Sequence, residues 1–224
     1  MTGNPNCQIW LTSALTESDV PKALTLCFSL KRVLTCRKVG VITSRQLPSH
    51  LIESLRQGFE YLFFLEDGRN SAGLKEQDFI KLFPLTLKPF EMCVFLSPTM
   101  LAVQNCDKIF EECCSQRFSG YLLTEGTGMD VFVIKPSPRV FENLMKVLVE
   151  TNGLGTENYI RAWVDTNNEA CKLLTSNYNL ILSAQSLPQS GGEKDVLIVN
   201  TRNLRLDMNI EELGLFTKVP AFQK

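Results

Sequence analysis

The chain has 224 residues, of which 44% are hydrophobic and 21% charged, and its formal net charge is −1. This composition is ordinary for a soluble globular protein with one sizeable domain or two small ones. A net charge so close to zero argues against bulk attraction to nucleic acid or to an anionic membrane surface. The longest apolar runs, such as residues 61–65 and 92–96, are far too short to span a bilayer.

The first ten residues, MTGNPNCQIW, lack a basic region followed by a long apolar core, so no secretory signal is predicted. The eight cysteines lack the spacing of a disulfide-stapled domain: Cys113 and Cys114 are adjacent, and Cys27 and Cys93 fall inside expected elements. No pair has C-x-x-C spacing, and a single histidine cannot complete a Cys/His metal site. We therefore expect reduced thiols, no metal, and a cytoplasmic or nuclear location.

Apolar strand patterns alternate with helical patterns along the first 65 residues. The helix after the first strand begins at Ser18 or Asp19 as N-cap, and the next has a proline start and a glycine stop. Near-continuous apolar strands separated by helices favour an α/β fold with a mostly parallel sheet. The expected strands cover residues 8–15, 38–43 and 61–65, and the expected helices cover residues 18–34 and 48–58.

The second half of the chain continues the alternation after a loop at residues 66–73. Residues 187–194 (LPQSGGEK) have the composition of a flexible linker. We expect one domain at residues 8–205, preceded by an N-terminal tail (1–7) and followed by a C-terminal tail or docking segment (206–224). The further expected helices cover residues 75–87, 105–114, 136–150 and 156–165, and the further strands cover 92–96, 121–124, 130–134, 178–183 and 195–200.

The strand expected at residues 92–96 ends in Ser97-Pro98-Thr99. The carboxyl end of a strand is where α/β proteins usually place ligand-binding side chains. A strand that leads into an active site often delivers acids, whereas this strand delivers two hydroxyls around a proline.

The stretch IKLFPLTLKPFEMCVFLSPTMLAVQNCDKIF (residues 80–110) resembles a pattern of glycogenin and its relatives, the family 8 glycosyltransferases, close to TKLxxxxLxxYxKCVFxDADTLVxxNxDxLF. The two align without a gap. Three shorter stretches are also similar to family patterns: ALTLCFSLKRV, VFVIKPSPRVFENLMKVL and YNLI. The resemblance covers roughly residues 8–184. It implies a GT-A fold, which is a Rossmann-like single domain with a central, mostly parallel mixed sheet flanked by helices.

The resemblance also implies a reaction, the transfer of glucose from UDP-glucose with a divalent metal at the diphosphate. Such a hard cation needs carboxylate oxygens, which the family supplies as an Asp-x-Asp at a strand end plus a downstream histidine. The Asp-x-Asp positions are Ser97 and Thr99 here, and neither hydroxyl carries the required charge. The family's HxxGxxKPW motif has no counterpart after Asp195, and the only histidine, His50, lies on an early helix.

Most other donor and acceptor positions of the family have also changed, and Lys81, which the family places near the diphosphate, remains in register. The changed positions are Gly128, Met129 and Asp130 for the family's NSG, Val20 for the aromatic residue that stacks on uracil, and Glu157-Asn158 (or Asn158-Tyr159 without a gap) for the DQ that contacts the donor glucose.

These losses predict a pseudoenzyme without catalytic residues, cofactor or UDP-sugar binding, which serves as a protein-interaction scaffold or regulatory subunit. The family's habit of forming homodimers makes self-association a further expectation. The expected interaction surfaces are residues 210–222 and the apolar segment 79–90.

Two alternatives remain open. One is a residual or metal-independent UDP-sugar transferase in which Glu125, Asp130 and Glu157 replace the missing ligands, although each also fits a solvated loop or helix-start carboxylate. The other is a nucleotide-sugar sensor that binds through Lys81 without turnover.

Overall fold

The computed structural model describes residues 4–67, 74–114, 120–123, 129–150, 155–167, 178, 180–181 and 198–201. The described strands are β1 (Gln8–Ala14), β2 (Lys38–Thr43), β3 (Tyr61–Phe64), β4 (Met92–Leu96), β5 (Met100–Ala102), β6 (Tyr121–Leu123), β7 (Val131–Ile134), β8 (Leu180–Ile181) and β9 (Ile198–Asn200). The described α-helices are α1 (Asp19–Arg32), α2 (Ser49–Gly58), α3 (Glu76–Leu82), α4 (Lys108–Cys114), α5 (Pro138–Glu150) and α6 (Thr156–Asn167). Short 3-10 turns cover Pro5–Cys7, Leu65–Asp67 and Phe83–Thr86.

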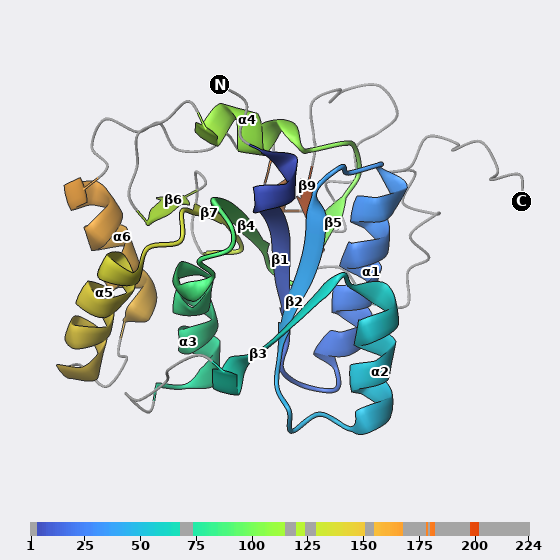
Figure 1. The fold of residues 1–224 in the computed structure, drawn as a ribbon, viewed down its shortest axis with the longest axis horizontal. Coiled ribbons are helices and arrows are strands. Elements are labelled where there is room, and N and C mark those ends of the chain that lie inside the picture. Colours follow the sequence, from blue (N-terminus) through green and yellow to red (C-terminus); the bar gives the residue numbers. More distant parts are fainter. Residues whose placement is uncertain are drawn as a thin grey trace, which may run out of the picture.

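A six-stranded mixed sheet forms the centre of the molecule (Figure 1), in the order β3-β2-β1-β4-β7-β6. The first four of these strands are parallel to one another, while β7 is antiparallel to β4 and β6 is antiparallel to β7. A second sheet has the order β5-β9-β8. The expected α/β fold with a mostly parallel mixed sheet flanked by helices is therefore confirmed.

Two apolar layers pack against the two faces of the large sheet. The first layer contains Trp10 of β1 with residues of α1, α2 and α4, and the second contains Ile9 and Leu11 with residues of α3, α5 and α6. Successive β1 side chains alternate between the layers because side chains of a strand point to opposite faces. Burial on both faces explains why these strands are nearly continuous apolar runs in the sequence.

Two expectations need correction, and one strand was missed. The helix expected at residues 75–87 ends at Leu82, because Pro84 lacks an N–H and its ring clashes with a continuing helix, so a 3-10 turn follows. The expected interaction surface at residues 79–90 is wrong, since Phe79, Leu82 and Leu85 of this segment are fully buried. Strand β5 was not expected at all.

The expected linker at residues 187–194, the tail from residue 206 and the expected surface at residues 210–222 lie outside the described residues. No helix in the described part of the chain is long and apolar enough to cross a membrane.

Candidate functional site

The carboxyl end of β4 is the candidate site, and a tight turn shapes it. The backbone N–H of Met100 donates to the carbonyl of Ser97 at 2.9 Å, which reverses the chain from β4 into β5. The backbone N–H of Ser97 donates to the carbonyl of Asp130 at 2.7 Å, next to the antiparallel pair of Leu96 and Val131. The strand therefore ends where the sequence predicted, and Asp130, the residue directly before β7, lies beside it.

Four polar side chains at this end are connected by hydrogen bonds. The hydroxyl oxygens of Ser97 and Thr99 lie 3.2 Å apart, and Thr99 Oγ1 donates to Asn200 Oδ1 at 3.2 Å. Asn200 Nδ2 in turn donates to Asp130 Oδ2 at 3.0 Å. We call Ser97, Thr99, Asn200 and Asp130 the Thr99 network.

The backbone fixes Asn200 in this position. The Thr201 backbone N–H and hydroxyl both donate to the carbonyl of Thr99, at 2.8 and 2.7 Å. Strand β9 pairs with β5 so that Asn200 stands opposite Met100. The sequence interpretation did not single out Asn200, although a polar residue at the end of the apolar run LIV was a signal that could have found it.

The Thr99 network is poor in ligands for a divalent metal. Ca²⁺ takes about six to eight oxygen ligands, and Mg²⁺ is held by one or two carboxylates together with waters and substrate phosphates, whereas this network holds one carboxylate, from Asp130. Asn200 already uses its oxygen and its nitrogen inside the network. Among the described residues, no group of three or more His, Cys, Asp or Glu side chains is arranged to hold a metal ion.

Two other positions implied by the resemblance, Lys81 and Glu157, form an ion pair with each other. Lys81 Nζ of α3 and Glu157 Oε1 in the first turn of α6 are 2.6 Å apart, with side chains 19% and 40% exposed. Tyr121 Oη donates to the Lys81 carbonyl at 2.6 Å. An acid in the first helical turn also suits the helix dipole. The charge of Lys81 is thus paired within the protein.

The remaining expected site residues belong neither to the Thr99 network nor to the Lys81–Glu157 ion pair. Val20, at the position of the uracil-stacking aromatic, is buried in the core layer beneath α1, and His50 is exposed on α2. Asn158 lies next to Glu157 in α6. Gly128 and Glu125 lie outside the described residues.

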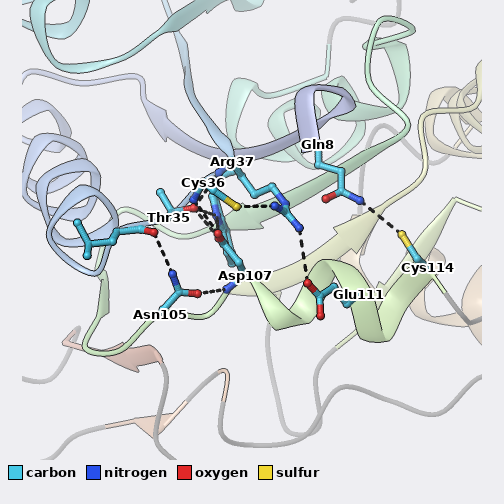
Figure 2. A network of polar contacts seen from close by, with 10 residues as sticks. Gln8, Thr35, Cys36, Arg37, Asn105, Asp107, Glu111 and Cys114 are labelled. Carbon is cyan, nitrogen blue, oxygen red and sulfur yellow. Dashed lines mark hydrogen bonds and ion pairs between the residues drawn. The ribbon is translucent and has the colours of Figure 1, made fainter. Parts of the chain in front are cut away.

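Two motif residues that match the family support the fold instead (Figure 2). Asn105 Nδ2 donates to the carbonyls of Val33 and Leu34, at 3.1 and 3.0 Å, at the end of α1. Asp107 is buried and accepts three hydrogen bonds, from Trp10 Nε1 at 3.1 Å, Thr35 Oγ1 at 2.5 Å and the Cys36 backbone N–H at 2.7 Å.

The architecture is the GT-A fold, which this chain shares with solved glycosyltransferase structures. Mouse xyloside xylosyltransferase 1 in its apo form matches with a TM-score of 0.59 at 12% identity, over 87% of this chain and 97% of that chain. Apo GlyE, a glycosyltransferase of Streptococcus pneumoniae TIGR4, also gives 0.59, at 11% identity, over 87% of this chain and 54% of that chain.

In sequence, the chain is similar to glycogenin. It is 24% identical to glycogenin-1 of Caenorhabditis elegans over 151 residues and 26% identical to glycogenin-1 of Mus musculus over 190 residues. These matches cover 63% and 77% of this chain, but only 35% and 56% of the relatives' lengths. No family profile matches the chain.

Proposed function

We propose that this glycosyltransferase-like domain is catalytically inactive and serves as a protein-interaction scaffold or regulatory subunit in the cytoplasm or nucleus. The observation that carries the proposal is the Thr99 network. At the strand end where the glycogenin-like pattern has Asp-x-Asp, this chain has two neutral hydroxyls. Hydrogen bonds connect them through Asn200 to one carboxylate, that of Asp130.

The physical argument concerns the charge of the donor. A UDP leaving group carries negative charge that a metal ion or a cluster of cations must neutralise. The Thr99 network offers hydroxyls and the negative charge of Asp130, which repels a diphosphate. Asn200 is the last residue of β9 and lies beside Thr99. We propose that it replaces the family's metal-binding histidine.

Thermal unfolding with and without millimolar UDP-glucose and Mn²⁺ tests the inactivity. A ligand that binds only the native state stabilises it by about 2.7 kcal/mol at a hundred times its dissociation constant. We expect no shift in Tm for this chain and a clear shift for mouse glycogenin-1 as the positive control. A metal-dependent shift in the natural chain would overturn the proposal.

A matched variant sharpens this test. In the double variant Ser97→Asp and Thr99→Asp, three carboxylates including Asp130 meet at the end of β4. We expect this variant to gain a Mn²⁺-dependent Tm shift that the natural chain lacks. Circular dichroism of the variant without metal confirms that it still folds.

The scaffold part of the proposal draws on surface chemistry. Phe28 of α1 and Leu34 just after it are the most exposed large apolar side chains among the described residues, at 60% and 72%. Self-association is part of the proposal, and sedimentation equilibrium of the full chain tests it. A monomer at all concentrations would leave a different protein as the partner.

One observation bears on the two alternatives, a nucleotide-sugar sensor and a metal-independent transferase: Lys81 of the first and Glu157 of the second form an ion pair. If the lysine receives a diphosphate, Glu157 competes for it. Calorimetry measures the affinity for UDP of the natural chain and of the Glu157→Gln variant, and this distinguishes the alternatives from an inactive scaffold. Binding that strengthens in the variant supports the sensor, and release of free glucose from UDP-glucose would support the transferase.

A further inference from the structure

A second polar cluster lies at the amino ends of β1 and β2, at the opposite end of the parallel strands from the Thr99 network. Gln8 begins β1 and Arg37 directly precedes β2, and the two strands pair Ile9 with Lys38. Gln8 and Arg37 are therefore neighbours across the strands. Side chains alternate along a strand, so Gln8 shares a face with Trp10, and Arg37 shares a face with Val39. Both faces belong to the layer under α1 and α4.

The bonds made by Gln8 fix the direction of its side-chain amide. Gln8 Nε2 donates to Cys114 Sγ at 3.4 Å, at the end of α4. The amide oxygen consequently faces away from Cys114, and Figure 2 shows it turned toward the guanidinium of Arg37. Gln8 is 1% exposed, and within the described part of the chain its Oε1 atom has no hydrogen-bond partner.

Two of the three guanidinium nitrogens of Arg37 have contacts within the described part of the chain. Nη1 donates to Cys36 Sγ at 2.6 Å, and Nη2 lies 3.9 Å from Glu111 Oε1 on α4. The guanidinium carbon is 5.6 Å from the ring centroid of Phe110, and the side chain is 6% exposed. Its Nε–H is buried and has no partner in the described region.

Buried donors and acceptors without a partner are rare in native proteins, because leaving them unpaired is costly. Here one atom donates and the other accepts. An anion would accept from Arg37 Nε but would be repelled by Gln8 Oε1, and a cation would have the reverse problem. A water molecule satisfies both, since it accepts one hydrogen bond and donates another.

We propose that Gln8 Oε1 and Arg37 Nε bind one buried water molecule between β1, β2 and α4. The water accepts from Arg37 Nε and donates to Gln8 Oε1. It extends the set of polar contacts, from Gln8 to Cys114 and from Arg37 to Glu111, that hold α4 on the sheet. This site is independent of the proposed function.

A crystal structure of the full chain at a resolution that shows ordered water tests the proposal directly. We expect a water peak roughly 3 Å from both Gln8 Oε1 and Arg37 Nε. A direct hydrogen bond between these two atoms would overturn the proposal, as would a site without density between them.

A double-mutant cycle provides an independent test in solution. Gln8→Met removes the acceptor, and Arg37→Lys keeps the charge while removing the Nε–H. If one water joins the two residues, the double variant loses less stability than the sum of the single losses. Glu111→Gln is the control, because it alters the ion pair at Nη2 and should add to Gln8→Met. Additive losses for Gln8→Met and Arg37→Lys would overturn the proposal.

Discussion

Replacing the Asp107 carboxylate tests whether the hydrogen bonds that it accepts stabilise the fold. Asp107 is 7% exposed and accepts from Trp10 Nε1 and Thr35 Oγ1 at Oδ1, and from the Cys36 backbone N–H at Oδ2. Asp107→Asn keeps Oδ1 but turns an amide N–H toward Cys36. One buried donor then lacks an acceptor, which costs about 1–3 kcal/mol.

Asp107→Ala leaves the Thr35 hydroxyl and the Cys36 backbone N–H without an acceptor, while Trp10 Nε1 keeps its 3.0 Å hydrogen bond to Thr35 Oγ1. Because two buried donors lose their acceptor, we expect a larger loss of about 3–5 kcal/mol. That loss approaches the whole stability of a marginal domain, about 5–15 kcal/mol. We therefore expect the free energy of unfolding to be highest for the natural chain, lower for Asp107→Asn and lowest for Asp107→Ala.

Urea unfolding followed by circular dichroism measures both losses, and an unchanged m-value shows that the comparison is two-state. Glu111→Gln on α4 is the matched control. Its carboxylate is 55% exposed and 3.9 Å from Arg37, so we expect a change within about 1 kcal/mol. Equal losses for Asn and Ala, or losses no larger than the control, would refute the reasoning that these hydrogen bonds stabilise the fold.

Three further predictions concern the backbone and the thiols. Leu34 has a φ of 59°, which is unfavourable for a residue with a Cβ, so Leu34→Gly should raise the free energy of unfolding by about 0.5–1 kcal/mol, whereas Leu34→Ala should not. Gly40→Ala should lower it by about 1–3 kcal/mol, because the added Cβ would lie 2.9 Å from Phe63 Cε2 and 3.0 Å from Ile9 Cδ1; an unchanged urea midpoint would contradict this. Burial raises the pKa of Cys27 from 9.0 to about 11. Between these two pH values the native state keeps the thiol proton while the unfolded state loses it. The stability due to this thiol is full below about pH 9 and is lost as the pH rises toward about 11, and a Cys27→Ala variant should show a shallower decline over that window.

The local patterns of the sequence were sufficient for most of the fold. Strands β1, β2 and β4 appeared as apolar runs because both of their faces are buried, and α1, α2 and α5 appeared through helical spacing and their termini. The replacement of Asp-x-Asp by Ser97 and Thr99 was also visible, because the alignment with the glycogenin pattern has no gap there.

Only the tertiary structure determined which distant side chains meet. Asn200 reaches Thr99 across 101 positions, because β9 pairs with β5. A strand was expected at residues 195–200, but the three-residue β5 has no pattern long enough to recognise, so its pairing with β9 could not be predicted. Lys81 and Glu157 are likewise 76 positions apart. An apolar run such as residues 79–90 looks the same in the sequence whether it faces a partner or its own core. Periodicity records which face of an element is apolar, whereas the packing of whole elements decides what that face contacts.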